Sequence, residues 1–146
     1  MTDITNRDIA GEAEASAVRL DVADVNRRLL GTWADVRLEA REMVKDPAFW
    51  RDDSLAKDAH RERVLEQLHL LVANGAVHRA FPKEYGGQEN NGANIAGFVE
   101  LVTADPSLQI KAGVQWGLFG SAVQQLGTKE HHDNWLPGIM SLEIPG

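Results

Sequence analysis

The sequence predicts an all-α protein, a helical bundle of about five helices. Apolar residues recur every three or four positions through most of the 146 residues, which is the spacing of an amphipathic helix. Capping residues and stop signals divide this pattern into separate helices, and no stretch gives a convincing strand. Residues 1–20 lack the pattern, so we expect a mobile N-terminal arm or a short surface helix there, and a helical domain over residues 21–146.

The first helix is expected over residues 21–45. Its apolar positions keep the helical spacing, and Asp21 is a suitable N-cap. Asp46-Pro47 ends the helix, because proline restricts the residue before it to extended geometry.

The second and third helices follow from the same signals. Ser54 precedes the second helix, expected over residues 55–73, and Asn74-Gly75 is a standard C-terminal stop. A connection with a glycine pair as its turn then leads to a shorter helix, expected over residues 93–104.

The fourth helix, residues 105–127, is the most apolar long segment of the chain. Asp105-Pro106 is a strong helix start, and Gly127 can close the other end. Strict apolar alternation in its middle is a strand signal, but about twenty residues are too many for an ordinary strand. We therefore expect a buried helix, followed by a fifth helix that begins after Thr128.

A stripe of small residues marks the fourth helix. Gly113, Gly117 and Ser121 fall at four-residue intervals and share one face, with Gly120 beside them. Each glycine costs about 1 kcal/mol relative to alanine inside a helix. The stripe therefore indicates that a second helix or a ligand approaches the backbone closely.

Composition excludes several classes of function. The chain has 15 basic and 22 acidic residues and a net charge of -7, which argues against a nucleic-acid partner. The absence of cysteine excludes disulfides and thiolate metal sites and fits a cytoplasmic protein. The polar N-terminus is unlike a secretory signal, and the longest uncharged run is too short and too polar for a membrane span.

No complete catalytic or metal-binding motif is present. Ser121 lies outside any Gly-x-Ser-x-Gly elbow, and the glycines lack the spacing of a dinucleotide-binding turn. Glu66 and His69 form one Glu-x-x-His motif, whereas a di-iron bundle requires two. His131 and His132 are adjacent, so they point in different directions from a helix and fit a solvated helix start better than a metal site.

Two further interpretations concern single side chains. Glu100 lies among apolar residues, and we expect it to face solvent on the polar side of its helix. The tryptophans are expected to be core and anchor residues; they are Trp33, Trp50, Trp116 and Trp135.

Three segments, in this order, resemble the acyl-CoA dehydrogenase family. Residues 81–87 (Phe-Pro-Lys-Glu-Tyr-Gly-Gly) are similar to its Pro-x-Glu-Tyr-Gly-Gly turn, residues 105–108 to the start of its long central helix, and residues 126–137 to a Gly-Thr segment that ends in Trp-Leu-Pro. The resemblance covers residues 55–146. The run over residues 114–120 and the long N-terminal arm favour the acyl-CoA oxidase branch.

The resemblance implies a three-part flavoenzyme, of which this chain corresponds to the N-terminal helical domain alone. The complete enzyme would use FAD to desaturate an acyl-CoA thioester between its α and β carbons. The flavin motif of the family's β-domain and the glutamate of its C-terminal bundle are absent from this sequence. We therefore expect no catalytic, flavin-binding or metal residues here, no bound FAD, and no activity of this chain alone.

The last residues, Ile144-Pro145-Gly146, read as a linker into another element, so the chain is expected to be a fragment. The implied partners are the β- and C-terminal domains of the same enzyme, the acyl-CoA substrate, and further copies in a homo-oligomer. We expect exposed apolar surface where the other domains would dock.

The resemblance also implies a role for the fourth helix as a wall of the acyl-chain pocket. Ile110, Val114 and Leu118 form an apolar stripe beside Gly113 and Gly117, and such a surface suits a fatty tail. Ordinary helix packing explains the same stripe equally well, so both interpretations stay open.

Two alternatives of other classes remain. The chain could be a non-enzymatic helical module for protein association, or, with less support, a di-iron or haem-binding bundle. The sequence that follows Gly146 in the gene would separate the first alternative from a flavoenzyme domain.

Overall fold

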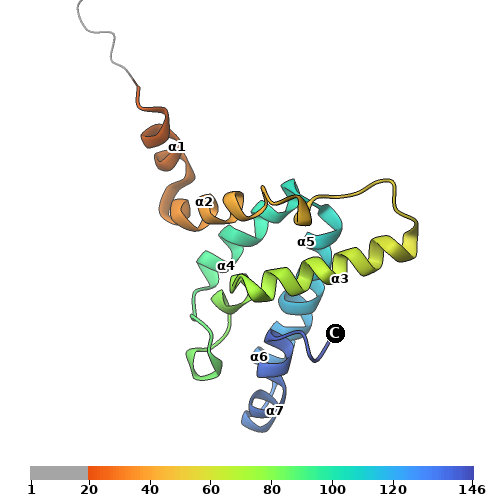
Figure 1. Cartoon of the computed structure of the whole chain (residues 1–146). Helices are drawn as coiled ribbons and strands as arrows, with labels where there is room; N and C mark the ends of the chain where they lie inside the picture. Colours follow the sequence, from red (N-terminus) through yellow and green to blue (C-terminus); the bar gives the residue numbers. More distant parts are fainter. Residues whose placement is uncertain (1–19) are drawn as a thin grey trace, which may run out of the picture. The chain divides into compact units, whose positions relative to one another are not determined.

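The computed structural model describes residues 20–146 and divides the chain into two units, Met1–Gly31 and Thr32–Gly146 (Figure 1). Apart from Leu20, the predicted mobile arm lies outside the described residues. In the first unit, α1 (Val22–Leu30) begins as expected, because the Asp21 carboxylate accepts hydrogen bonds from two backbone N–H groups of the first turn.

Most of the described residues are helical and none of them lies in a strand, which confirms the all-α fold class. In the second unit the α-helices are α2 (Ala34–Met43), α3 (Lys57–Ala73), α4 (Asn91–Phe98), α5 (Pro106–Ala112), α6 (Ser121–Leu126) and α7 (Lys129–Met140). Short 3-10 helices cover Pro47–Phe49, Ala76–Arg79, Lys83–Tyr85 and Val99–Thr103, and a π-helical segment covers Gly113–Gly120.

The predicted first helix, residues 21–45, is divided in the structure into α1 and α2. Gly31 has a φ of 71°, a left-handed conformation that an α-helix cannot continue through and that glycine adopts without strain. The sequence showed continuous apolar spacing across this point, and the glycine was the signal against one uninterrupted helix.

The remaining predicted helices are present with shifted bounds. α4 continues into a 3-10 helix up to Thr103, and α5, the π-helical segment and α6 follow one another without a break over Pro106–Leu126. This last stretch, called the long helix below, is the predicted fourth helix. Only one side of it is buried: Leu108 and Ala112 are in the core, whereas Ile110 and Leu118 are about two-thirds exposed.

The second unit packs its helices in pairs around one core. α2 lies against α4, α3 against α5, and α7 against α6 and the π-helical segment (Figure 1). The deepest side chains come from segments far apart in the sequence; they include Phe49, Leu71, Phe81, Leu108, Leu136 and Ile139.

The C-terminal residues pack back onto the long helix. The Gln115 amide donates to the Ile144 carbonyl at 2.9 Å and accepts from the Gly146 backbone N–H at 2.7 Å. This explains why Gln115, a polar side chain, is buried in an otherwise apolar segment.

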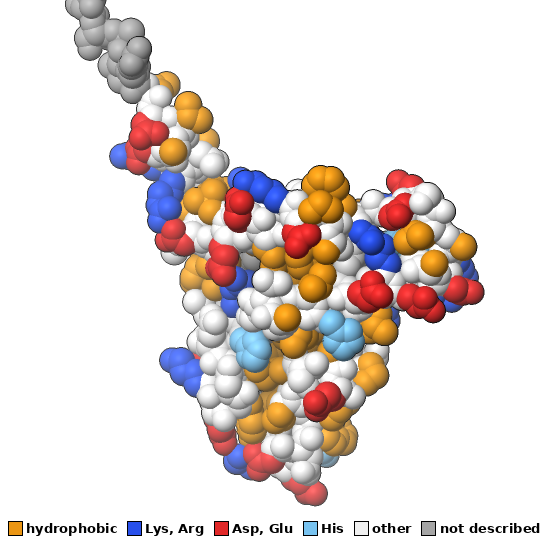
Figure 2. Space-filling view, in the orientation of Figure 1, with side chains coloured by type: hydrophobic (Ala, Val, Ile, Leu, Met, Phe, Trp, Pro, Cys, Tyr) orange, Lys and Arg blue, Asp and Glu red, His pale blue; other side chains and the backbone are white. Residues whose placement is uncertain are grey.

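Charged side chains of both signs gather before and along the first turns of α3 (Figure 2). Arg51 pairs with Asp53, and Arg61 pairs with Asp58. None of the helices described is long and apolar enough to cross a membrane.

Candidate functional site

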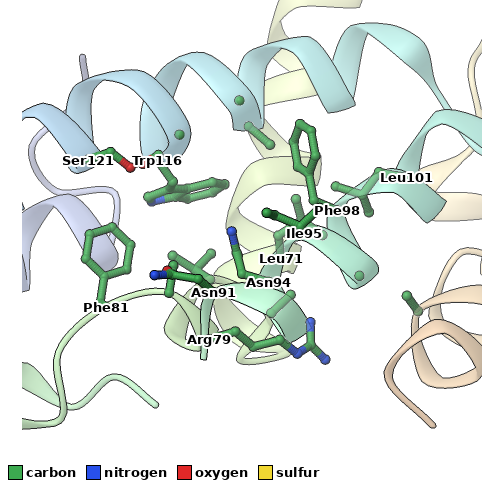
Figure 3. Close-up of a pocket in the computed structure, with 18 of the residues that line it drawn as sticks. Leu71, Arg79, Phe81, Asn91, Asn94, Ile95, Phe98, Leu101, Trp116 and Ser121 are labelled. Atoms are coloured by element: carbon green, nitrogen blue, oxygen red, sulfur yellow. Dashed lines mark hydrogen bonds between the residues drawn. The ribbon is translucent and has the colours of Figure 1, made fainter. Parts of the chain in front are cut away.

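A cavity of about 610 Å³ lies between the long helix and α4 (Figure 3). Its volume is in the range of ligand pockets. Side chains from α2, α3, the Ala76–Arg79 turn, α4 and the long helix line it, and most of them are apolar; they include Met43, Leu71, Phe81, Ile95, Phe98 and Trp116.

All five residues predicted as the wall of an acyl pocket line this cavity. They are Ile110, Gly113, Val114, Gly117 and Leu118. Ser121 continues the lining, as its place in the small-residue stripe predicts, whereas Lys111 is exposed and does not line the cavity. The structure thus brings the apolar and the small stripe to one side of a hollow.

The glycines of the long helix have different roles. A Cβ atom on Gly113 would lie 3.2 Å from the Phe98 ring, and one on Gly120 would lie 2.9 Å from the Phe81 ring. A Cβ atom on Gly117 would meet nothing within 4 Å. Close packing therefore accounts for Gly113 and Gly120, and only Gly117 leaves open space in the cavity.

The π-helical segment places Trp116 in the cavity wall. The Ser121 backbone N–H donates to the Trp116 carbonyl five residues earlier, and the Ser121 hydroxyl donates to the same oxygen at 3.3 Å. The Trp116 indole N–H donates to the Ile139 carbonyl at 2.9 Å, which fixes the ring against α7. Such i→i+5 segments are rare and occur frequently at functional sites.

Polar side chains at the cavity come mainly from α4 and the Ala76–Arg79 turn. Asn91 and Asn94 point from α4 toward Trp116 and the long helix (Figure 3). Arg79 also lines the cavity, and its guanidinium donates to Glu39 at 3.0 Å. Sequence reasoning missed these residues, although the i, i+3 spacing of Asn91 and Asn94 was a signal that they share a face.

We expected Glu100 to face solvent, but the structure shows it buried and ion-paired. Arg37 donates to one carboxylate oxygen at 2.7 Å, and Arg41 donates to the other at 2.8 Å. Burial by itself raises the pKa of Glu100, but the hydrogen bonds from Arg41 and Arg37 outweigh it and hold the pKa below its ordinary value. Glu100 does not line the cavity, so its role is to join α2 to the segment after α4.

Two of the family-like segments meet at the start of α7. The Lys129 ammonium donates to the Glu84 carboxylate at 2.7 Å and to the Tyr85 hydroxyl at 3.0 Å, and the Tyr85 hydroxyl donates to Asp133 at 2.7 Å. The hydrogen bond from Lys129, with that from Tyr85, lowers the pKa of the Asp133 carboxyl.

The glycine pair that follows Tyr85 has two separate requirements. Gly86 has a φ of 87°, and a Cβ atom on Gly87 would lie 1.9 Å from the Phe81 carbonyl oxygen. The Pro-Lys-Glu-Tyr-Gly-Gly sequence is therefore explained by the geometry of the turn and its attachment to α7, not by contact with the cavity.

No metal centre is formed within residues 20–146: no three His, Asp or Glu side chains converge there. Glu66 and His69 are exposed on α3. His131 accepts from the Thr128 backbone N–H at 3.1 Å, and the His132 ring bonds the Val123 carbonyl, so both histidines organise the start of α7.

The tryptophan prediction holds in part. Trp33 is half-buried, and Trp116 packs against the core, but Trp50 and Trp135 are each about half exposed. Trp50 is nevertheless anchored, because its indole N–H donates to the Val44 carbonyl at 3.0 Å.

Comparison with known proteins gives consistent results. The family described as "Acyl-CoA dehydrogenase, N-terminal domain" matches residues 34–143. "Acyl-coenzyme A oxidase 2, peroxisomal" from Arabidopsis thaliana is 32% identical over 142 residues, which are 92% of this chain and 20% of that protein. "Acyl-coenzyme A oxidase 3, peroxisomal" from the same plant is 30% identical over 95 residues, 65% of this chain and 14% of that protein.

The chain thus spans a fifth or less of the length of these curated relatives. No solved structure matches the chain.

Proposed function

The chain belongs to the family of acyl-CoA dehydrogenase N-terminal domains, and from this we propose that it is the N-terminal helical part of a longer FAD-dependent enzyme that desaturates acyl-CoA thioesters. The observation that supports this most is the apolar cavity along the long helix. The residues that the resemblance implied for the acyl pocket, Ile110, Val114 and Leu118, line it together with Gly113 and Gly117.

The proposed role of this cavity is to hold the acyl chain of the substrate. Ile95 and Phe98 of α4 and Trp116 of the long helix line its walls (Figure 3). Each buried methylene of an acyl chain contributes about 0.8 kcal/mol to binding, and the gap left at Gly117 gives the chain access to the helix backbone.

FAD enters this proposal as the cofactor of the longer enzyme. The described residues do not fit a flavin: they form no strand, so no glycine-rich turn between a strand and a helix is available, and the cavity's one basic side chain, Arg79, is paired with Glu39. FAD would be held by other parts of the enzyme and would supply the redox chemistry of the desaturation. This chain would orient the acyl chain and exclude water from it.

We favour the oxidase branch, in which oxygen reoxidises the flavin, because both relatives named above are acyl-CoA oxidases. The expectation of a cytoplasmic location rests on composition alone, and the names of those two proteins describe them as peroxisomal. Fluorescence of a tagged full-length protein, imaged beside a peroxisomal marker, would distinguish the two locations.

The substitution Val114→Trp in the full-length enzyme tests the proposed cavity. Val114 lines the cavity and is partly exposed, so the larger indole would fill the space of the distal methylenes. We expect kcat/KM to fall at least tenfold more for a long acyl-CoA than for a short one, which corresponds to about 1.4 kcal/mol.

Val102→Trp is the matched control, because Val102 is similarly exposed and does not line the cavity. It should leave the ratio of long-chain to short-chain kcat/KM unchanged. If Val114→Trp lowered kcat/KM equally for all chain lengths, Val114 would not be part of the acyl site.

A non-enzymatic association module is the second candidate, and the exposed apolar side chains of Ile110, Leu118 and Leu126 favour it. The two candidates differ in the flavin content of the full-length protein. One FAD per chain after purification supports the enzyme, and a flavin-free full-length protein that binds no acyl-CoA supports the association module.

A further inference from the structure

Two amide side chains on α4 face the cavity without partners. The side-chain amides of Asn91 and Asn94 form no hydrogen bond with any other group of residues 20–146, and both line the cavity (Figure 3). Asn90 fixes the start of α4, because its side-chain oxygen accepts from the Ala93 backbone N–H at 3.1 Å. The i, i+3 spacing then places the two amides on one face.

The other polar groups of the cavity are already bonded. The Trp116 indole N–H donates to Ile139, the Ser121 hydroxyl donates to the Trp116 carbonyl, and Arg79 pairs with Glu39. The two asparagines are thus the side chains in this lining that can offer both a donor and an acceptor to a ligand.

The cavity around the two amides is mostly apolar, so whether they find hydrogen-bond partners affects ligand binding. Asn91 is exposed and Asn94 is partly buried, so water can solvate both amides while the cavity is open. An acyl chain bound against Asn94 would displace the water there. An amide left unpaired against hydrocarbon costs about 1–3 kcal/mol, whereas a ligand oxygen at the same place would restore the hydrogen bond. Sites that hydrogen-bond a ligand hydroxyl discriminate strongly against the analogue that lacks it.

We propose that Asn91 and Asn94 make this cavity selective for acyl groups that carry a hydroxyl or carbonyl oxygen along the chain. This inference rests on the proposed acyl-binding function. The oxygen would be neutral, because an amide pair carries no charge and the Glu39 carboxylate offsets the charge of Arg79. Plain hydrocarbon chains bind the same cavity more weakly.

Tryptophan fluorescence of the chain tests the proposal, because Trp116 lies in the cavity wall. The ligands are dodecanoate and a panel of dodecanoates that carry one hydroxyl at successive carbons. We expect at least one hydroxylated member to bind about tenfold more tightly than dodecanoate. Trp116→Phe should remove most of the ligand-dependent signal.

The variant Asn94→Leu should abolish the preference, because it should lower the affinity for the hydroxylated ligand and raise the affinity for dodecanoate. Asn91→Leu is the second variant, to be used if circular dichroism shows that Asn94→Leu does not fold. Asn134→Leu is the control, since Asn134 is exposed on α7 and outside the cavity. This control variant should bind the hydroxylated ligand more tightly than dodecanoate, as the wild type does.

The outcomes separate this inference from the function on which it rests. Equal affinity for dodecanoate and every hydroxylated member would overturn the selectivity and leave the acyl cavity in place. Failure of all these ligands to bind would overturn both. A preference that persists in folded Asn94→Leu and Asn91→Leu would show that other groups carry it and would also overturn the proposal.

Discussion

At the scale of single residues, Glu100 shows how a buried charge is held. Its carboxylate is almost fully buried and accepts hydrogen bonds from both Arg37 and Arg41 of α2. The two arginines remain partly exposed, so solvent screens part of their attraction. The interaction is still oriented, because Arg37 donates to one carboxylate oxygen, and Arg41 donates to the other at 2.8 Å and makes a longer contact of 3.5 Å to the first.

We expect Glu100→Gln to lower the free energy of unfolding by about 1.5–3 kcal/mol, the range for hydrogen bonds to charged groups. Urea denaturation followed by circular dichroism measures this. Glu42→Gln removes an exposed pair with Lys45 and should change stability by no more than about 0.5 kcal/mol.

The difference in the free energy of unfolding between the wild type and Glu100→Gln also depends on pH. The folded pKa of Glu100 lies below its unfolded value, so the ionised carboxylate stabilises the fold above the unfolded pKa and loses this effect as pH falls through the folded pKa. We expect the gap between wild type and Glu100→Gln to narrow on acidification. A gap that stays constant from neutral to acidic pH would contradict the ion pair.

At the scale of elements, the long helix combines packing on one side with a cavity on the other. Gly120 sits against Phe81 and Ile139 in the core, and Gly117 opens onto the cavity. The two glycines lie in the same π-helical segment, so they provide a matched pair for separating close packing from cavity formation.

Gly120→Ala should lower stability by about 1–3 kcal/mol, because its Cβ atom would lie 2.9 Å from the Phe81 ring and 3.2 Å from Ile139 in a packed core. Gly117→Ala should leave stability unchanged or raise it by up to about 1 kcal/mol. Thermal denaturation compares the two variants. Equal losses would mean that the backbone conformation, and not side-chain space, requires both glycines.

At the scale of the whole molecule, apolar side chains reach the surface in several places (Figure 2). Four of them lie on α4 and the long helix, where Ile95, Ile110, Leu118 and Leu126 are each more than half exposed. Exposed apolar groups that gather on neighbouring elements are typical of interaction surfaces. In the proposed enzyme, the remaining domains or a second copy would cover them.

We therefore expect this chain alone to associate in solution. Size-exclusion chromatography with light scattering should give a mass that rises with concentration, and Leu118→Glu should reduce that rise. Leu65→Glu is the control, because Leu65 is half exposed on α3, away from the cavity. A monomer at every concentration would argue against an uncovered docking surface.

The sequence by itself determined the local features of this protein. Apolar spacing and caps such as Asp105 predicted the helices, and the small stripe identified one side of the cavity, because both signals depend on neighbours within a few residues. Only the tertiary structure decided that Glu100 is ion-paired and that Asn91 and Asn94 face the long helix. Those contacts join segments far apart in the chain, and helical periodicity contains no information about which faces meet.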